Sequence, residues 1–191
     1  MNLSPLQKAR YEYSPKLPGM LRNGIAEIAV KEGEKTTSAA DQEKIAELFP
    51  NTYGEPEVTF EKGQNTSAAK KQVVGVILSG GQAPGGHNVI SGIFDGIKKL
   101  NKDSKLYGFI LGPGGLVDHN YMELTADIID EYRNTGGFDI IGSGRTKLEK
   151  EDQFEKGLEI LKELNIKALV IIGGDDSNTN ACVLAEYYAA K

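Results

Sequence analysis

Two glycine-rich stretches, LSGGQAPGGHN (residues 78–88) and IIGGDDSNTN (residues 171–180), decide the fold that we expect for this chain. Each stretch follows an apolar run and places Gly-Gly beside small polar residues, where a strand is expected to turn into a helix. Backbone N–H groups at such a turn bind phosphate oxygens, and the positive end of the following helix strengthens the attraction. The adjacent Asp175 and Asp176 in the second stretch suggest a metal ion that bridges protein and phosphate. Together the two stretches indicate phosphoryl-transfer chemistry.

Around these stretches, apolar strands alternate with amphipathic helices from residue 72 onwards. This alternation predicts a doubly wound, mostly parallel α/β sheet, in which ligands collect at the carboxyl ends of the strands. The glycine-rich turns all fall at those ends, and GPGGLVDHN (112–120) is expected to be a turn. The expected strands are 73–78, 105–111, 138–141 and 168–172, and the expected helices are 89–100, 121–134, 151–164 and 178–190.

Residues 1–70 differ from the rest, and we expect an extended N-terminal arm followed by an α/β part at 71–191. Five of the seven prolines lie in the arm, and strong strand runs are absent from it. One short amphipathic helix is expected at 41–49. Such an arm is stable only against another surface, which is either the body of the same subunit or a neighbouring one.

Composition narrows the class of protein. The chain has 191 residues, of which 39% are hydrophobic and 26% charged, as expected for a globular protein with a core. No apolar run approaches the roughly 20 residues of a membrane span. The first 30 residues lack the apolar core of a signal peptide, so we expect a cytoplasmic protein without a membrane partner. The net charge of −5 argues against a nucleic-acid partner.

Other residues are open to two interpretations. Arg145, on the turn Gly-Ser-Gly-Arg-Thr, is placed either to stabilise a phosphate or to pair on the surface with Glu149. Asp175 is favoured as a Mg²⁺ ligand, although a helix cap followed by a first-turn acid is the alternative. His87 is expected to be solvated or helix-capping, and Cys182, the only cysteine, to be a small core residue.

Three motifs, taken in order, resemble the phosphofructokinases. They are Gly-Gly-x-x-Pro-Gly at 80–85, Gly-Ser-x-Arg at 142–145 and Gly-Gly-Asp-x-Ser at 173–177. The resemblance covers the chain from about residue 72, and residues 4–18 (SPLQKARYEYSPKLP) look like the arm of the long, diphosphate-dependent members.

This resemblance implies a role for each matching position. It implies that glycine amides and a serine contact the phosphoryl donor, that an arginine neutralises the transferring group, and that an aspartate binds Mg²⁺. The residues are Gly80, Gly81, Arg145 and Ser177 for the diphosphate, Asp175 for the metal, and Arg145 and Asp176 for catalysis and donor selection.

The resemblance assigns the choice of donor to Asp176, because the ATP-using members have glycine at this position and the diphosphate-using members have aspartate. A carboxylate here resembles the α-phosphate of ATP in charge and space. An α-phosphate about 4 Å away would be disfavoured by roughly 4 kcal/mol at an effective dielectric constant of about 20, or about a thousandfold. Diphosphate has no third phosphate and escapes this repulsion.

The resemblance thus implies reversible, Mg²⁺-dependent transfer from inorganic diphosphate to fructose 6-phosphate, giving fructose 1,6-bisphosphate, by a homo-oligomeric enzyme. The family's Pro-Lys-Thr-Ile-Asp-x-Asp stretch, whose first aspartate is the general base, does not occur among these 191 residues. We therefore expect an N-terminal portion of a longer enzyme, which binds diphosphate weakly and is inactive alone.

Two alternatives remain open at this point. One is a non-catalytic phosphate-binding subunit or module of the same fold. The other is a kinase of the NAD or lipid type, which also uses a Gly-Gly-Asp loop but does not supply the first-loop and Gly-Ser-x-Arg patterns seen here.

Overall fold

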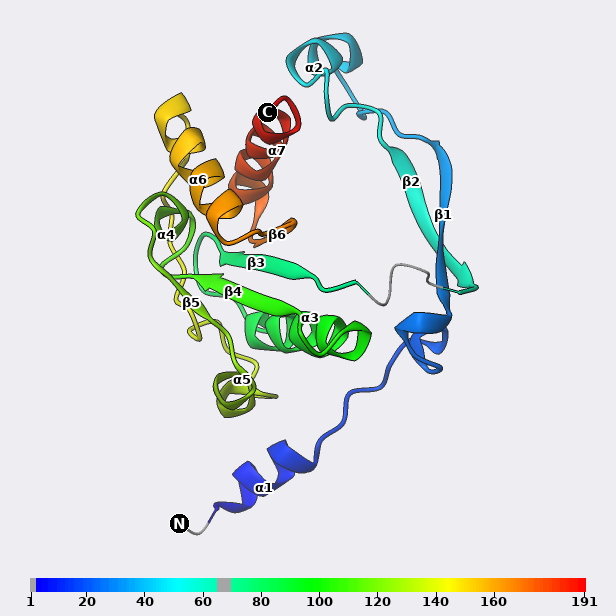
Figure 1. Cartoon of the computed structure of the whole chain (residues 1–191), viewed down its shortest axis with the longest axis vertical. Coiled ribbons are helices and arrows are strands. Elements are labelled where there is room, and N and C mark those ends of the chain that lie inside the picture. The colour runs from blue at the N-terminus through cyan, green and yellow to red at the C-terminus, as the bar shows by residue number, and fades with distance from the viewer. Residues whose placement is uncertain (1–2, 65–69) are drawn as a thin grey trace.

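The computed structural model describes residues 3–64 and 70–191. Within these ranges a four-stranded sheet has helices on both faces, and the N-terminal part extends away from it (Figure 1). The strand order is β5-β4-β3-β6, with β5 antiparallel to β4 and the other pairs parallel. The strands are β3 (Val73–Leu78), β4 (Lys105–Phe109), β5 (Tyr121–Glu123) and β6 (Ala168–Ile172).

The central strand β3 is buried along its whole length, as a continuous apolar run in a parallel sheet should be. Its register sets Leu78 opposite Ile172 of β6, and Ile77 opposite Phe109 of β4. The two glycine-rich stretches therefore begin side by side at one edge of the sheet. β6 is an edge strand among the described residues, and most of its side chains are only partly buried.

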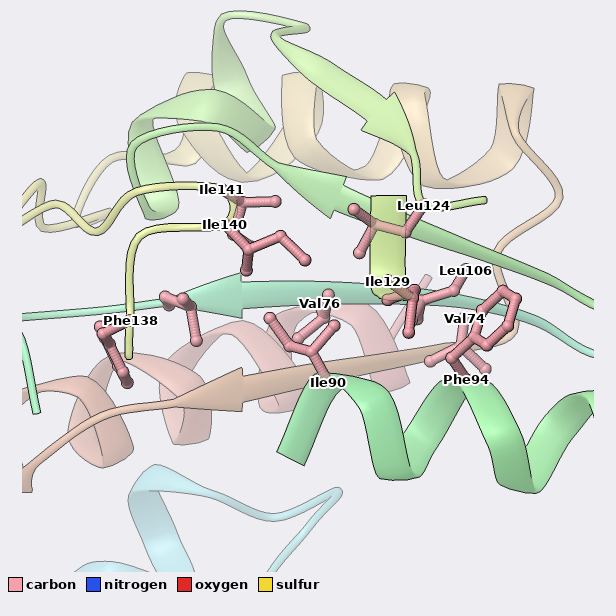
Figure 2. Close-up of a cluster of buried hydrophobic side chains, with 11 residues drawn as sticks. Val74, Val76, Ile90, Phe94, Leu106, Leu124, Ile129, Phe138, Ile140 and Ile141 are labelled. Carbon is pink, nitrogen blue, oxygen red and sulfur yellow. The ribbon is translucent and has the colours of Figure 1, made fainter. Parts of the chain in front are cut away.

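Helices cover the sheet on both faces, which confirms the expected doubly wound fold. Figure 2 shows Ile90 and Phe94 packed against Val74, Val76 and other residues of the cluster on one face. A second cluster fills the other face and includes Ile77, Phe109 and Leu184. The first face carries α3 (Gly86–Leu100) and α5 (Ala126–Tyr132), and the second carries α4 (Pro113–Val117), α6 (Glu151–Glu163) and α7 (Asp175–Ala189).

Three expectations for this part of the chain were wrong. The expected helix at 121–134 is split, because residues 121–123 pair with β4 and only 126–132 are helical. The turn at 112–120 contains α4, which Pro113 begins at a position where a missing N–H costs nothing. The expected strand at 138–141 forms no ladder, although Phe138, Ile140 and Ile141 are buried in the core.

The arm has more regular structure than expected. The helix predicted at 41–49 is present as α2, but strands β1 and β2, on either side of it in the sequence, form a two-stranded antiparallel sheet where no strong strand was expected. Residues 65–69, which the sequence assigns to the end of the arm, lie outside the described residues. The arm elements are α1 (Pro5–Glu12), η1 (Gly19–Leu21), η2 (Ile25–Glu27), β1 (Ile28–Lys35), α2 (Gln42–Leu48) and β2 (Pro56–Lys62).

Side chains of the body hold the arm in two places. Asn134 donates hydrogen bonds to the backbone oxygens of Arg10 and Tyr13, at 3.0 and 3.1 Å. The carboxylate of Glu186 on α7 accepts from Thr52 Oγ1 at 2.7 Å and from the backbone N–H of Asn51 at 3.0 Å. The arm is therefore stabilised in part by its own subunit.

Cys182 was expected in the core, and the structure places it at the surface instead. It lies on α7 and lines a shallow pocket together with Ile45 and Phe49 of the arm. The apolar pattern around it correctly predicted a helix, but α7 has one face toward the sheet and Cys182 lies off that face.

Candidate functional site

The carboxyl ends of β3 and β6 and the turn after Ile141 enclose a cavity of about 500 Å³. Every site residue that the sequence singled out lines this same cavity. These residues are Gly80, Gly81, Arg145, Asp175, Asp176 and Ser177.

Hydrogen bonds at the ends of the strands bring these three segments together. The backbone N–H of Ser79 donates to Ile172 O at 2.7 Å, and that of Gly80 donates to Gly144 O at 2.8 Å. Ser79 and Gly144 also form a parallel bridge, so the turn that carries Arg145 continues the sheet by one residue pair. The first glycine-rich stretch is thus held between the other two.

The hydroxyl of Ser177 does not face the open cavity. Its Oγ donates to Ser79 Oγ at 2.8 Å, and both residues are buried. The backbone N–H of Ser177 lies in the first turn of α7, where amides have no partner inside the helix. The amide of Ser177 is therefore better placed than its hydroxyl to contact a phosphate in the cavity.

Arg145 lies against the first glycine-rich stretch. Its Nη2 is 2.8 Å from the position that a Cβ on residue 81 would occupy, so the guanidinium rests where only glycine leaves room. None of the ion pairs among the described residues joins Arg145 to Glu149, the alternative that the sequence left open. Arg145 thus supplies positive charge to the cavity.

Asp175 and Asp176 begin α7, and neither caps it. The residue before the helix is Gly174, which makes no side-chain cap. Asp176 is 87% exposed at the side chain, and its carboxylate is 3.9 Å from Lys147 Nζ. Two exposed carboxylates suit Mg²⁺, which binds through one or two carboxylates and completes its shell with water and phosphate oxygens. No cluster of three or more acidic, histidine or cysteine ligands occurs among the described residues.

Residues 73–190 match the family model described as phosphofructokinase. The chain belongs to the phosphofructokinase family.

Relatives and solved structures extend this result. The chain is 62% identical over 190 residues to the pyrophosphate–fructose 6-phosphate 1-phosphotransferase of Porphyromonas gingivalis, covering all of this chain and 34% of that protein. It is 50% identical to the protein of the same name from Entamoeba histolytica, covering 35% of its length. The chain therefore spans about a third of the length of these relatives. The family match sets aside the NAD or lipid kinase alternative.

Among solved structures, the chain resembles Pichia pastoris phosphofructokinase, with a TM-score of 0.53 and 29% identity over 62% of this chain and 13% of the other. It also resembles the pyrophosphate-dependent phosphofructokinase of Marinobacter aquaeolei in fold, with a TM-score of 0.55 and 20% identity over 62% of this chain and 30% of that one. No helix in the described part of this chain is long and apolar enough to cross a bilayer.

Two residues that line the cavity were missed in the sequence analysis. Lys147 adds a second cation to the turn that carries Arg145, and its place two residues further along could have been noticed. Asn180 fixes this turn to α7, because its side chain accepts from Leu148 N–H at 3.2 Å and donates to Leu148 O at 2.6 Å. Nothing in the local sequence indicates that contact.

His87 and its glycine neighbours lie apart from the cavity. The first stretch therefore divides in two: Gly80 and Gly81 line the cavity, whereas Gly85 and Gly86 begin α3. His87 was expected to be solvated or to cap the helix, but it is 2% exposed and α3 has no side-chain cap. Its side chain is hydrogen-bonded in the interior instead.

Replacing Gly81 by alanine tests whether the position of the Arg145 guanidinium against Gly81 matters for ligand binding. The new Cβ meets the flexible end of Arg145, so the melting temperature should hardly change while the guanidinium is displaced. We expect diphosphate affinity to fall about fivefold to tenfold, the equivalent of roughly 1 kcal/mol or slightly more. Titration calorimetry and thermal denaturation of the same samples measure the two quantities. Gly92→Ala on α3 is the matched control, because a Cβ there meets nothing within 4 Å and Gly92 does not line the cavity.

Proposed function

We propose that this chain forms the donor-binding part of a phosphotransferase that uses inorganic diphosphate to phosphorylate fructose 6-phosphate at its 1-hydroxyl. The observation that carries the proposal is that Arg145, Asp175 and Asp176 line one cavity at the start of α7. The relatives named above carry this activity in their names, which supports the same donor and acceptor here.

The chemistry of the cavity fits a phosphoryl donor with two phosphates. The bond between the bridging oxygen and one phosphorus breaks, and that phosphoryl group passes to the sugar oxygen while orthophosphate leaves. The reaction is proposed to be reversible, since one phosphoryl bond is exchanged for another. The hydroxyl proton passes to a general base, which we place in the part of the relatives that this chain does not span.

The residues of this chain position the donor and balance its charge, which is most of what catalysis of phosphoryl transfer requires. Arg145 and the amides of the first turn of α7 neutralise and orient the phosphate oxygens. Asp175 is placed to hold Mg²⁺, which supplies positive charge to the donor when bound. Asp176 occupies the space that an α-phosphate of ATP would enter. We place the working enzyme in the cytoplasm as a homo-oligomer.

A chimera tests this proposal. The matching 190 residues of the Porphyromonas gingivalis protein are replaced by this chain, and formation of fructose 1,6-bisphosphate is followed with diphosphate and with ATP. We expect Mg²⁺-dependent activity with diphosphate close to that of the parent, and activity with ATP lower by up to about a thousandfold. The chimera with Asp175→Asn is the control and should lose the metal-dependent rate.

The outcome separates this function from the alternative of a non-catalytic phosphate-binding module. A folded chimera that binds diphosphate but forms no product would favour the module. A chimera that prefers ATP would show that the donor assignment is wrong. Titration of the 191-residue chain alone should show weak diphosphate binding without turnover.

A further inference from the structure

His87 occupies a position that the proposed chemistry does not explain. It is the second residue of α3, its ring is buried, and it packs edge-on against Tyr132 of α5 at 4.9 Å between centroids. On its other side lies the segment 133–150, which contains neither helix nor ladder strand and which carries Arg145 into the cavity. The ring therefore sits between the core and the segment that positions Arg145.

The hydrogen bonds around the ring fix its tautomer. Thr135 Oγ1 donates to Tyr132 O at 2.6 Å, so its hydrogen is in use and its oxygen accepts from His87 Nδ1–H. His87 Nε2 then bears a lone pair and accepts two backbone hydrogens, from Asp139 N at 2.8 Å and from Ile140 N at 3.0 Å. These three hydrogen bonds are satisfied by a neutral ring with the proton on Nδ1.

Two titratable groups face the ring, the Asp139 carboxylate and the Tyr132 phenol. Asp139 Oδ1 is 2.9 Å from His87 Nε2, which favours the charged ring, but its side chain is 69% exposed. Burial of the imidazole outweighs Asp139, so the pKa of His87 lies below its usual value. The two backbone hydrogens that already point at Nε2 also leave no room for a third.

Backbone contacts connect this ring to the turn that carries Arg145. His87 N–H donates to Gly137 O at 2.9 Å, and a Cβ on Gly137 would come within 2.7 Å of the His87 ring. Gly142 N–H then donates to Asp139 O at 3.1 Å, so the glycine turn begins on the peptide that His87 holds. Arg145 lies three residues beyond Gly142.

We propose that neutral His87 is a positioning residue for Arg145, because it fixes the backbone at Asp139 and Ile140 from which the glycine turn leaves the core. The importance of this for donor binding rests on the proposed function. Protonation of His87 would place a hydrogen on Nε2, break both backbone bonds and loosen the turn.

The direction of the pH effect follows from the lowered pKa of His87. The unfolded chain binds a proton at this histidine at a higher pH than the folded chain does, so folded-state stability rises with pH in this range. The contribution of the neutral ring is complete above about pH 6.5, the ordinary histidine value, and is lost as the pH falls below it. The order of the glycine turn should decline at lower pH, where the ring in the folded protein itself takes up a proton.

Nitrogen-15 NMR of the 191-residue chain tests the proposal without any assay of activity. The imidazole should show a protonated Nδ1 and an unprotonated Nε2 at about pH 7.5, well above the ordinary histidine pKa. On acidification, the amide signals of Asp139, Ile140 and Gly142 should move together with the ring. A proton on Nε2 at that pH would overturn the proposal. Amide signals of Asp139, Ile140 and Gly142 that do not change while the ring titrates would overturn it as well.

Variants separate positioning from simple support of the fold. His87→Gln should weaken Mg²⁺-diphosphate binding about tenfold and shift the Gly142 amide signal. Should that variant not fold, Thr135→Val, which removes the acceptor of Nδ1–H, should give the same pattern more weakly. Thr135→Ser keeps the hydroxyl and should restore parental behaviour, and Asp139→Asn should leave binding unchanged at the same pH.

The two proposals can fail separately. Absence of diphosphate binding by the parent chain would count against the proposed function, whereas the NMR result would still decide the role of His87. Loss of binding in Asp139→Asn equal to that in His87→Gln would show that the carboxylate, and not the neutral ring, orders the turn.

Discussion

Asp176→Gly in the chimera should raise activity with ATP by a factor between about five and a thousand, while activity with diphosphate persists. The upper value corresponds to removal of a charge about 4 Å from an α-phosphate at an effective dielectric constant of about 20, and the lower to the same charge in bulk water. The side chain is 87% exposed before any ligand is bound, so the water that remains near the bound donor decides where the result falls.

Lys147 should reduce the expected gain in ATP activity, because its Nζ lies 3.9 Å from the Asp176 carboxylate and partly balances the negative charge of that carboxylate. Asp176→Asn, which removes the charge and keeps most of the volume, separates repulsion from steric exclusion. If the Asp176→Asn enzyme behaves like the parent while the Asp176→Gly enzyme accepts ATP, the barrier is steric. An Asp176→Gly enzyme that still shows no activity with ATP would contradict the role assigned to Asp176.

Arg145→Ala should lower the diphosphate-dependent rate of the chimera by about a hundredfold to a thousandfold, as removal of one preorganised donor to the reacting group does in other enzymes. The guanidinium is the cation that rests over Gly81 in the cavity, and alanine leaves the phosphate charge there unbalanced. Steady-state kinetics with varied diphosphate measure the effect, and thermal denaturation checks that the fold is kept.

Lys147→Ala is the comparison for this variant. Lys147 lines the same cavity but is 58% exposed and already faces Asp176, so its loss should cost only about a tenfold reduction in rate. Arg145→Lys keeps the charge without the planar fork and should recover only part of the activity. Equal losses in Arg145→Ala and Lys147→Ala would contradict the distinct position assigned to Arg145.

Much of the α/β part could be predicted because its elements obey simple periodicities. The continuous apolar run of β3 and the amphipathic spacing of α6 specify a buried strand and a covering helix without help from distant residues. The convergence of Gly81 and Asp176 also follows from topology, since the carboxyl ends of the neighbouring parallel strands β3 and β6 lie at one edge. Arg145 joins them through the bridge between Ser79 and Gly144, which strand periodicity does not predict.

The failures lie where tertiary contacts override local pattern. Tyr121 pairs with Phe109 in β4 instead of continuing toward the helix, and the centroids of the two rings lie 6.2 Å apart. The apolar run at 138–141 is buried without a ladder because His87 takes up two of its amides. The start of α1 was a missed signal and not an override, since Ser4 and Gln7 form a capping box that the sequence displays.

The hydrogen bond between Ser79 and Ser177, with the clamp of Asn180 on Leu148, has a consequence for how the cavity receives a ligand. These contacts fasten the three cavity segments to one another in the free protein. Little conformational entropy then remains to be lost when an anion arrives, so association should proceed without slow rearrangement. Segments fastened in this way have little freedom to separate around a bulkier molecule, so the spacing of the cavity walls is set when the chain folds.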